Sequence, residues 1–371
     1  MEDNSEIKVK EIVVSAEQIT VPVVEKEKDF LDILKMFAPG TSIRSALDDL
    51  LNAHMGALIV FDNGKVLDFS EKGFKINSKF SPQKLVELAK MDGAIIISKD
   101  GKKILYANAL LAPDRGILTK ETGTRHKAGE RTAKQAKTLV ITVSERKNKI
   151  TIYYNDLRYE LKESSEILRR AAETLQILEK QKEIYNDLIA DLNILEINNF
   201  VTINDVAAIL QRIEIIKRIS NIVKRYLVEL GREGIVVSLR LKELIGNVAR
   251  EEDFILKDYF MPNHLIAMET LDKMNFDFLL ELPNVSRMLF QELHDKPIFP
   301  KGLRLLSKTN LLDRHKVALV DKLKNLNKVL SASDEELLGV FESKEMINSF
   351  SKEINNLREK IITRRDIDSL I

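Results

Sequence analysis

The N-terminal part of the chain alternates short, β-rich apolar runs with segments whose apolar side chains recur at helical spacing. Turn residues such as Asp62-Asn63-Gly64 bound these runs. Strands are predicted over residues 57–61, 66–69, 94–98, 104–111, 139–143 and 150–154, and helices over residues 30–37, 43–51, 82–90 and 125–137. Thr41 or Ser42 is the predicted start of the second helix, and Ser81-Pro82 that of the third. Interleaved strands and helices predict an α/β N-terminal domain, a mixed sheet flanked by helices, over residues 28–158.

The pattern changes after this domain. Residues 161–197 contain neither Gly nor Pro, and their apolar side chains form a stripe with a seven-residue repeat that only Lys182 interrupts: Ala171, Leu175, Leu178, Tyr185, Ile189 and Leu192. This stripe predicts a long helix, packed in a bundle rather than as an isolated coiled coil. We expect an all-α linker over residues 159–300 and a small helical C-terminal domain over residues 301–371. Residues 1–27 are predicted to be a mobile N-terminal extension rather than an added edge strand.

Composition narrows the functional classes. The 371 residues are 44% hydrophobic and 31% charged, with a net charge of +1, so the chain as a whole has no attraction to nucleic acid or to an anionic membrane. The absence of cysteine excludes disulfides, thiolate metal sites and a cysteine nucleophile. The sequence has no signal-peptide pattern at its start and no apolar run of the roughly 18 residues that a membrane span needs. We therefore expect a cytoplasmic protein that does not bind membranes.

One segment of the sequence favours phosphate binding. The chain has no P-loop, no nucleophile elbow and no histidines at metal-ligand spacing. The run Glu121-Thr-Gly-Thr-Arg-His-Lys-Ala-Gly-Glu-Arg131, however, enters a predicted helix through Gly123, with Thr124 as a candidate cap. Arg125, His126 and Lys127 then lie at a helix start, where free backbone N–H groups favour an anion. This cluster is either a cradle for a polyphosphate or a solvated basic first turn.

A carboxylate could complete such a site. Met91-Asp92-Gly93-Ala94 lies at the mouth of a predicted buried strand. An Asp-Gly pair alone often marks only a turn. Together with the basic helix start, however, Asp92 could hold Mg²⁺ and a nucleoside triphosphate between the two elements.

These residues resemble a known family, the diadenylate cyclases of the DNA integrity scanning (DisA) type. The similar segments are Pro39-Gly-Thr-Ser-Ile-Arg-Ser-Ala-Leu-Asp-Asp49, Gly56-Ala-Leu-Ile-Val60, Met91-Asp-Gly-Ala94, Tyr106-Ala-Asn108 and Thr122-Gly-Thr-Arg-His126. The resemblance implies that two ATP molecules face each other across a dimer of catalytic domains and condense to cyclic di-AMP, with release of two pyrophosphates. It also implies a homo-oligomer, an octamer in this family.

The resemblance also implies roles for individual residues. Asp92 would bind the catalytic metal, Mg²⁺ or Mn²⁺, and would act in catalysis with Arg125 and His126. The residues that would bind ATP are Gly93, Leu111 (through its backbone), Thr124, Arg125, His126, Lys127, Ala128 and Ser144.

The sequence departs from the family pattern at two places. Lys127 replaces the third member of a usual Arg-His-Arg triplet, which keeps the charge but loses the planar bidentate fork. The C-terminal region resembles helix-hairpin-helix units that bind branched DNA, with nearby basic residues Lys308, Arg314, His315, Lys316, Lys322 and Lys324, but the hairpin expected at residues 339–344 lacks its glycine pair and contains Glu342. Because phosphate contacts supply most non-specific affinity, this change weakens the DNA hypothesis.

Two other functions are compatible with the sequence. One is an oligomeric nucleotide- or DNA-sensing scaffold with a weakened cyclase site. The other is a nucleotidyltransferase that uses a different acceptor. The intact Asp92 and Thr124-Arg125-His126 favour the cyclase.

Overall fold

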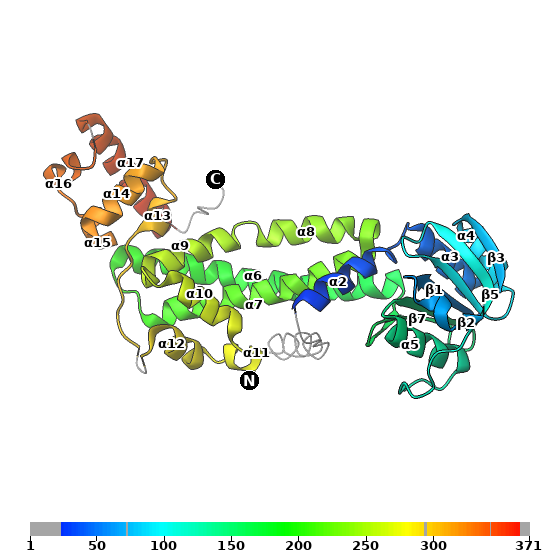
Figure 1. Ribbon diagram of the computed structural model, residues 1–371. Helices are drawn as coiled ribbons and strands as arrows, with labels where there is room; N and C mark the ends of the chain where they lie inside the picture. The colour runs from blue at the N-terminus through cyan, green and yellow to red at the C-terminus, as the bar shows by residue number, and fades with distance from the viewer. Residues whose placement is uncertain (1–23, 72, 293–294, 342, 364–371) are drawn as a thin grey trace. The chain divides into compact units, whose positions relative to one another are not determined.

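The computed structural model describes residues 24–71, 73–292, 295–341 and 343–363 (Figure 1). Within this part, one compact unit contains residues 24–172 and 224–238, and the other contains residues 173–223 and 239–363. Most of the predicted N-terminal extension, residues 1–23, lies outside the described residues. Helix α2 (Val24–Lys35) begins directly after it.

The first unit contains an eight-stranded sheet. The strand order is β2-β5-β4-β1-β6-β7-β8, and β3 also pairs with β5. The strands are β1 (Ala57–Asp62), β2 (Ser70–Glu71), β3 (Phe74–Lys79), β4 (Ala94–Ser98), β5 (Lys103–Leu111), β6 (Leu139–Ser144), β7 (Lys149–Tyr154) and β8 (Leu157–Leu161). Strands β1 and β4 are parallel, whereas the other pairs are antiparallel, so the predicted mixed sheet is confirmed.

Helices cover both faces of this sheet. Alternate residues of β1 enter two different cores, with Ile59 and Phe61 in one and Leu58 and Val60 in the other, as the two-residue period of a strand requires. Helices α2, α3 (Ser42–Asn52) and α4 (Pro82–Ala89) contribute to the first core, and α5 (Thr124–Ala136) to the second. Helix α5 packs tightly because Gly129 has no side chain; a Cβ there would lie 2.8 Å from Thr142.

Local signals explain most of these boundaries. The side chains of Thr41 and Ser81 accept backbone N–H groups at the starts of α3 and α4, as predicted. The predicted strand at residues 66–69 is wrong, because Val66–Phe69 forms a 3-10 turn. Strand β1 already pairs with β4 and β6 on its two edges, so the chain after the Asp62-Asn63-Gly64 turn has no edge of β1 left to join.

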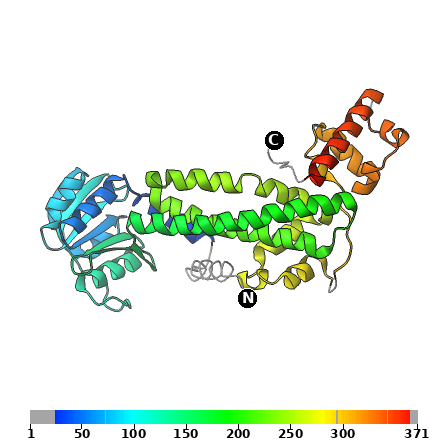
Figure 2. The ribbon, with the colours of Figure 1, turned by 180° about the vertical axis from the view of Figure 1, so that it is seen from behind.

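The remaining described residues are mainly helical, as predicted. The helices are α6 (Ser164–Asn198), α7 (Ile203–Leu230), α8 (Ile235–Ile245), α9 (Val248–Phe260), α10 (His264–Lys273), α11 (Phe276–Leu279), α12 (Leu282–Phe290), α13 (Leu303–Leu306), α14 (Asp313–Leu323), α15 (Leu326–Leu330), α16 (Asp334–Leu338) and α17 (Lys344–Ile362), with a 3-10 turn at Gly231–Gly234. Figure 2 shows α6 and α7 from behind, as long neighbouring helices. All six residues of the predicted stripe on α6 are buried, which confirms bundle packing.

Buried charges join helices within the second unit. The guanidinium of Arg304 on α13 is fully buried and donates to Glu196 on α6 at 2.6 Å and to Glu251 on α9 at 2.7 Å. Asp258 on α9 accepts the backbone N–H groups of residues 302–304 at the start of α13. Removing one partner of such a cluster would leave a buried charge uncompensated, so these contacts fix α13 on the preceding helices.

Candidate active site at one edge of the sheet

Four strand ends meet at one edge of the sheet. Strands β1 and β4 are parallel and both begin at this edge, while their antiparallel neighbours β6 and β5 end there. The register pairs Ala57 with Val143 and Ala94 with Ala109. This brings together residues that are distant in sequence, namely Gly56, Asp92, Gly93, Leu111 and Ser144.

The N-terminus of α5 lies at the same edge and carries free amides. The cap residue is Gly123, with extended backbone angles, and not Thr124, which is the first helical residue; the predicted cap is therefore wrong. The first helical hydrogen bond runs from the Lys127 N–H to the Gly123 carbonyl oxygen. Because glycine has no side chain, no side-chain cap covers the N–H groups of Thr124, Arg125 and His126. These three donors are available to an anion.

The side chain of Arg125 connects this helix to the start of β4. Its Nη2 lies 3.3 Å from the Asp92 carboxylate, whose side chain is 99% exposed. To reach it, the guanidinium crosses the start of β1 at Gly56, where an added Cβ would lie 2.2 Å from Arg125 Nη1. The two elements that the sequence analysis paired are therefore in contact, and Gly56 leaves the space for that contact.

The backbone beside Asp92 explains two further residues. Gly93 has a φ of +89°, and a Cβ there would lie 2.9 Å from the Ala109 carbonyl oxygen of β5. Leu111 pairs with Ser70, while the adjacent Ala112 N–H donates to the Phe69 carbonyl oxygen. Since backbone groups alternate along an antiparallel strand, the N–H and C=O of Leu111 point away from β2, toward the side of β4 and Asp92.

The loop that leads into α5, residues 112–123, is tied to that helix by side chains on one of its faces. Glu130 contacts the Thr119 hydroxyl, Arg131 donates to the Ile117 carbonyl oxygen, and Lys134 donates to the Leu118 carbonyl oxygen. Gln135 accepts the Asp114 N–H. The loop is thereby fixed without secondary structure of its own.

Glu121 ties the end of this loop to the sheet. Its Oε1 accepts hydrogen bonds from the Tyr153 hydroxyl on β7 at 2.9 Å and from Arg158 Nε on β8 at 2.6 Å. Burial raises the pKa of Glu121, but the bonds from Arg158 and Tyr153 outweigh it and hold that pKa below its ordinary value. None of these three residues was predicted to belong to the site, because the contacts link positions 32 and 37 apart in the chain.

His126 lies between charges of both signs. Burial lowers the pKa of its imidazole, and the positive charges of Lys147, Arg158 and Arg125 lower it further, whereas the Glu121 carboxylate raises it. The balance lies below the ordinary value, which favours the neutral ring. A neutral imidazole can donate one hydrogen bond to a phosphate oxygen without adding a full charge.

The other predicted binding residues lie around the same helix start. Lys127 is partly buried on the first turn, Ala128 packs against the core under α5, and Ser144 ends β6. The Ser144 hydroxyl accepts the Lys147 N–H at 3.3 Å. All the residues predicted to bind ATP thus lie at one edge of the sheet or on the adjoining turn of α5.

Comparison with known proteins identifies the family. Residues 44–157 match the family model described as DisA bacterial checkpoint controller nucleotide-binding, and residues 161–294 match the one described as DisA bacterial checkpoint controller linker region. The DNA integrity scanning protein DisA of Acetivibrio thermocellus is 46% identical over 322 residues, which cover 84% of this chain and 89% of that protein. The chain belongs to the DisA family.

Further relatives carry the same name. The DNA integrity scanning protein DisA of Clostridioides difficile is 43% identical over 84% of this chain and 89% of its own length, and that of Clostridium acetobutylicum is 39% identical over 93% and 99%. As a DisA-family chain with the family's nucleotide-binding domain, the protein is a diadenylate cyclase, which is a nucleotidyltransferase. The site described above lies within that domain.

The donor set around Asp92 fits a metal ion that is shared with the substrate. In the described ranges 24–71, 73–292, 295–341 and 343–363, no three His, Asp or Glu side chains cluster as a metal cage. Mg²⁺, however, is commonly held by one or two carboxylates together with substrate phosphates and water. The exposed Asp92 carboxylate beside the uncapped start of α5 is compatible with that arrangement.

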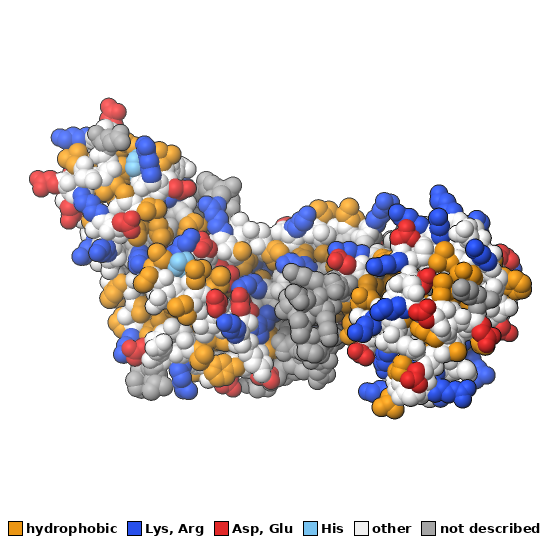
Figure 3. Space-filling model, viewed as in Figure 1, with side chains coloured by type: hydrophobic (Ala, Val, Ile, Leu, Met, Phe, Trp, Pro, Cys, Tyr) orange, Lys and Arg blue, Asp and Glu red, His pale blue; other side chains and the backbone are white. Residues whose placement is uncertain are grey.

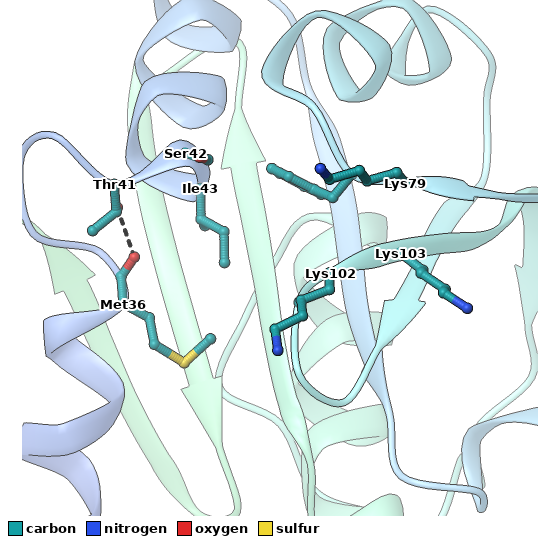
Figure 4. A pocket seen from close by; sticks show the side chains of 9 residues that line it. Met36, Thr41, Ser42, Ile43, Lys79, Lys102 and Lys103 are labelled. Carbon is teal, nitrogen blue, oxygen red and sulfur yellow. Dashed lines mark hydrogen bonds between the residues drawn. The ribbon is translucent and has the colours of Figure 1, made fainter.

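A cavity of about 630 Å³ opens at the opposite edge of the same sheet (Figure 4). It lies between the start of α3 and the β4–β5 turn, and its lining includes Met36, Ile43, Phe80, Lys79 and Lys102. Gly101, at the other end of β4 from Gly93, also lines it. The cavity is therefore separate from the site around Asp92.

In this DisA-family chain, the basic residues of the C-terminal region do not form a single exposed patch. His315 is buried, and the Lys308 ammonium is largely buried 3.9 Å from Glu251, so neither side chain is available to a phosphate. The Lys322 ammonium donates to the Glu336 carbonyl oxygen beside Gly339. Arg314 and Lys324 are exposed. Glu342 lies outside the described residues.

Proposed function

We propose that this cyclase condenses two ATP molecules into cyclic di-AMP and releases two pyrophosphates. The observation that carries the proposal is the 3.3 Å contact between Arg125 and Asp92 at the uncapped start of α5. Donors for phosphate and a carboxylate that could bind a metal ion would then lie around one nucleoside triphosphate. The assignment of the family's nucleotide-binding domain to residues 44–157 supports it.

The residues of the site would divide the work. The free amides of Thr124, Arg125 and His126 would hold the triphosphate, with positive charge from Arg125 and Lys127. The backbone of Leu111 would hydrogen-bond the adenine edge, and Ser144 would lie near the phosphates. Positioning of this kind and charge stabilisation are the main demands of phosphoryl-type transfer.

Asp92 would hold Mg²⁺ or Mn²⁺ together with phosphate oxygens. Such an ion, when bound, lowers the pKa of a hydroxyl group and stabilises charge on the phosphate. Asp92 itself would orient the 3′-hydroxyl for attack on the α-phosphate. Arg125 would neutralise the charge that develops there, and His126 would stabilise it with a hydrogen bond.

The reaction also calls for a second copy of the chain. Each 3′-hydroxyl attacks the other ATP, so two sites have to face each other, and the protein would act as a dimer of catalytic domains within a homo-oligomer. We propose an octamer, by resemblance to the family. Light scattering would measure the mass directly, and a monomer under conditions that support turnover would contradict the proposal.

One assay tests the reaction. Purified protein is incubated with ATP and Mn²⁺, and the products are separated by chromatography. We expect cyclic di-AMP from the wild type and none from Asp92→Asn, whereas Asp32→Asn, which changes an exposed carboxylate on α2, should keep full activity. ATP that is bound but unchanged would instead support a sensing scaffold. A linear product with another acceptor would support the third function.

We also propose a weak regulatory contact with DNA through the exposed basic residues of α14 and its C-cap, Arg314 and Lys324. Acidic side chains lie among the basic ones over the C-terminal helices α14–α17, as Figure 3 shows for one face. Asp334, Glu335 and Glu336 all lie in the first turn of α16. Such mixed charge favours low affinity.

A further inference from the structure

We propose that Glu121 is the positioning residue of the cyclase site: it fixes the loop that enters α5 onto β7 and β8, and it presents a negative charge to the His126 imidazole. The inference rests on the proposed function, because it concerns how that site holds a triphosphate. It assigns a role to three residues outside the predicted site, Glu121, Tyr153 and Arg158.

The contacts of Glu121 with Tyr153 and Arg158, called the anchor below, are well formed. The Glu121 side chain is 12% exposed and accepts two hydrogen bonds, one from β7 and one from β8. Neither donor, Tyr153 or Arg158, has a predicted role in binding. The bond from Arg158 is charge-assisted, and such bonds are roughly twice as strong as neutral ones. Burial and the bond to Glu121 raise the pKa of Tyr153 to well above its ordinary value, so this hydroxyl stays a donor at any pH at which the enzyme works.

The anchor is also close to the donors that would hold phosphate. Only Thr122 separates Glu121 from Gly123, and the three free amides of α5 follow directly. Because adjacent Cα atoms are about 3.8 Å apart, a loop end that is free at residue 121 can move the start of the helix by an ångström or more. A misplacement of about 1 Å can reduce catalysis by about two orders of magnitude.

The second part of the proposal concerns the electrostatic effect of Glu121 on His126. The charges that act on its imidazole come from four different elements: Lys147 in the β6–β7 turn, Arg158 on β8, Arg125 on α5 and Glu121 in the loop. The first three oppose a proton on the ring, and Glu121 favours it. Without Glu121 the ring would lose the charge that offsets three cations.

Glu130 offers a matched control. It also ties the 112–123 loop, through Thr119 and Lys134, and it is equally hidden, with a side chain 10% exposed. It lies one to two turns further along α5, on the face toward that loop. A merely structural role for Glu121 would make the two variants behave alike.

The test compares Glu121→Gln with Glu130→Gln in the full chain. Deuterium exchange at the imidazole Cε1–H, followed by mass spectrometry of the peptide that contains His126, gives the pKa of that ring whatever the oligomer size. We expect Glu121→Gln to lower this pKa by about 0.5 or more, a threefold change in protonation equilibrium, and Glu130→Gln to leave it unchanged. Equal pKa values in wild type and Glu121→Gln would overturn the proposal.

Kinetics provide the second readout. We expect Glu121→Gln to raise the KM for ATP about tenfold with a smaller loss in kcat, and Arg158→Gln to do the same. The double variant should be no worse than either single one, because both break a single contact. Glu121→Asp keeps the charge, so the pKa of His126 should stay close to its wild-type value in this variant. Its shorter side chain can still leave the KM for ATP high. Additive losses in the double variant would contradict the anchor.

The two measurements distinguish a failure of this proposal from a failure of the proposed cyclase function. If the wild type formed no cyclic di-AMP, the proposed function would fail, while the exchange measurement would still show whether Glu121 acts on His126.

Discussion

The guanidinium of Arg125 lies 3.3 Å from the carboxylate of Asp92, 33 positions away in the chain. The carboxylate is almost fully exposed and the arginine side chain is 40% exposed, so this ion pair contributes little to stability, typically less than about 1 kcal/mol. A weak pair opens at little cost. In the proposed function, a metal ion would then bind Asp92 and a phosphate would bind Arg125. The ion pair would keep both groups close to the positions that a metal–triphosphate complex needs.

The first prediction concerns the glycine beneath this arginine. In Gly56→Ala the new methyl group would overlap with Arg125 Nη1, and the flexible guanidinium would move away from Asp92. We expect kcat/KM for ATP to fall at least about tenfold, which corresponds to about 1.4 kcal/mol of lost transition-state stabilisation. The melting temperature should change little, because the atom that must move is the end of a side chain. Steady-state kinetics and a thermal melt measure both.

A second glycine provides the control for Gly56. At Gly246, a new Cβ would meet only carbonyl oxygens, the nearer at 3.4 Å, which is ordinary contact. Gly246→Ala should therefore keep both activity and melting temperature. Wild-type activity in Gly56→Ala would show that the position of Arg125 does not matter.

The next prediction concerns Lys127, on the first turn of α5. An arginine here would add a planar fork that can donate two hydrogen bonds to one phosphate, whereas lysine offers a point charge. We expect Lys127→Arg to make about two to ten times more cyclic di-AMP than the wild type at limiting ATP. If the variant made no more product than the wild type, Lys127 would not contact the triphosphate.

The sequence predicted the central strands well because their apolar runs are short, β-branched and bounded by turn residues. It missed β3 because Phe74–Lys79 alternates with lysines and is largely exposed, with Phe74 60% exposed, so this strand has almost no buried face to produce a pattern. It also missed β8, where Leu157–Leu161 is only partly buried. Edge strands of this kind are defined by their partners and not by their own composition.

The same distinction applies to the site. Asp92 and residues 124–127 were identified because each lies at the start of a regular element, where the local sequence shows a turn or a basic first turn. Glu121, Tyr153 and Arg158 had no such signal, since their contact depends on how β7 and β8 pair beside the loop. One local hint existed: an acidic residue two positions before a glycine that leads into a basic helix start.

A further prediction concerns how the stability contributed by the junction between α9 and α13 depends on pH. Burial, together with the nearby Glu196 carboxylate, raises the pKa of Asp258 to about 7, although its oxygens accept three backbone N–H groups at 2.7–3.0 Å. A pKa raised above the unfolded value of 3.8 means that the folded state holds this proton more tightly. The contribution of Asp258 to stability therefore falls as the pH rises from about 4 to about 7, and is constant above that range.

Melting temperatures between pH 5 and pH 8.5 test this. The melting temperature of Asp258→Asn should rise relative to that of the wild type as the pH increases to about 7. Above that pH, the difference between the two melting temperatures should stay constant. Asp313→Asn, which changes a 96% exposed carboxylate, should show a constant difference from the wild type. A constant difference for Asp258→Asn as well would mean that this carboxyl group does not titrate in the folded protein over that range.

The last prediction concerns DNA. Only part of the predicted basic group is exposed, and the backbone amides of residues 302–304, which could have met a phosphate, are already bonded to Asp258. We therefore expect weak binding of branched DNA that depends on Arg314 and Lys324. Each phosphate contact contributes about 0.9 to the slope of log K against log salt, so the double variant Arg314→Glu/Lys324→Glu should reduce that slope by about 1.8. A gel shift at several salt concentrations measures it, with Lys75→Glu on β3 as the control. No shift with the wild type at micromolar protein and moderate salt would reject a DNA contact, and the cyclase would then act without it.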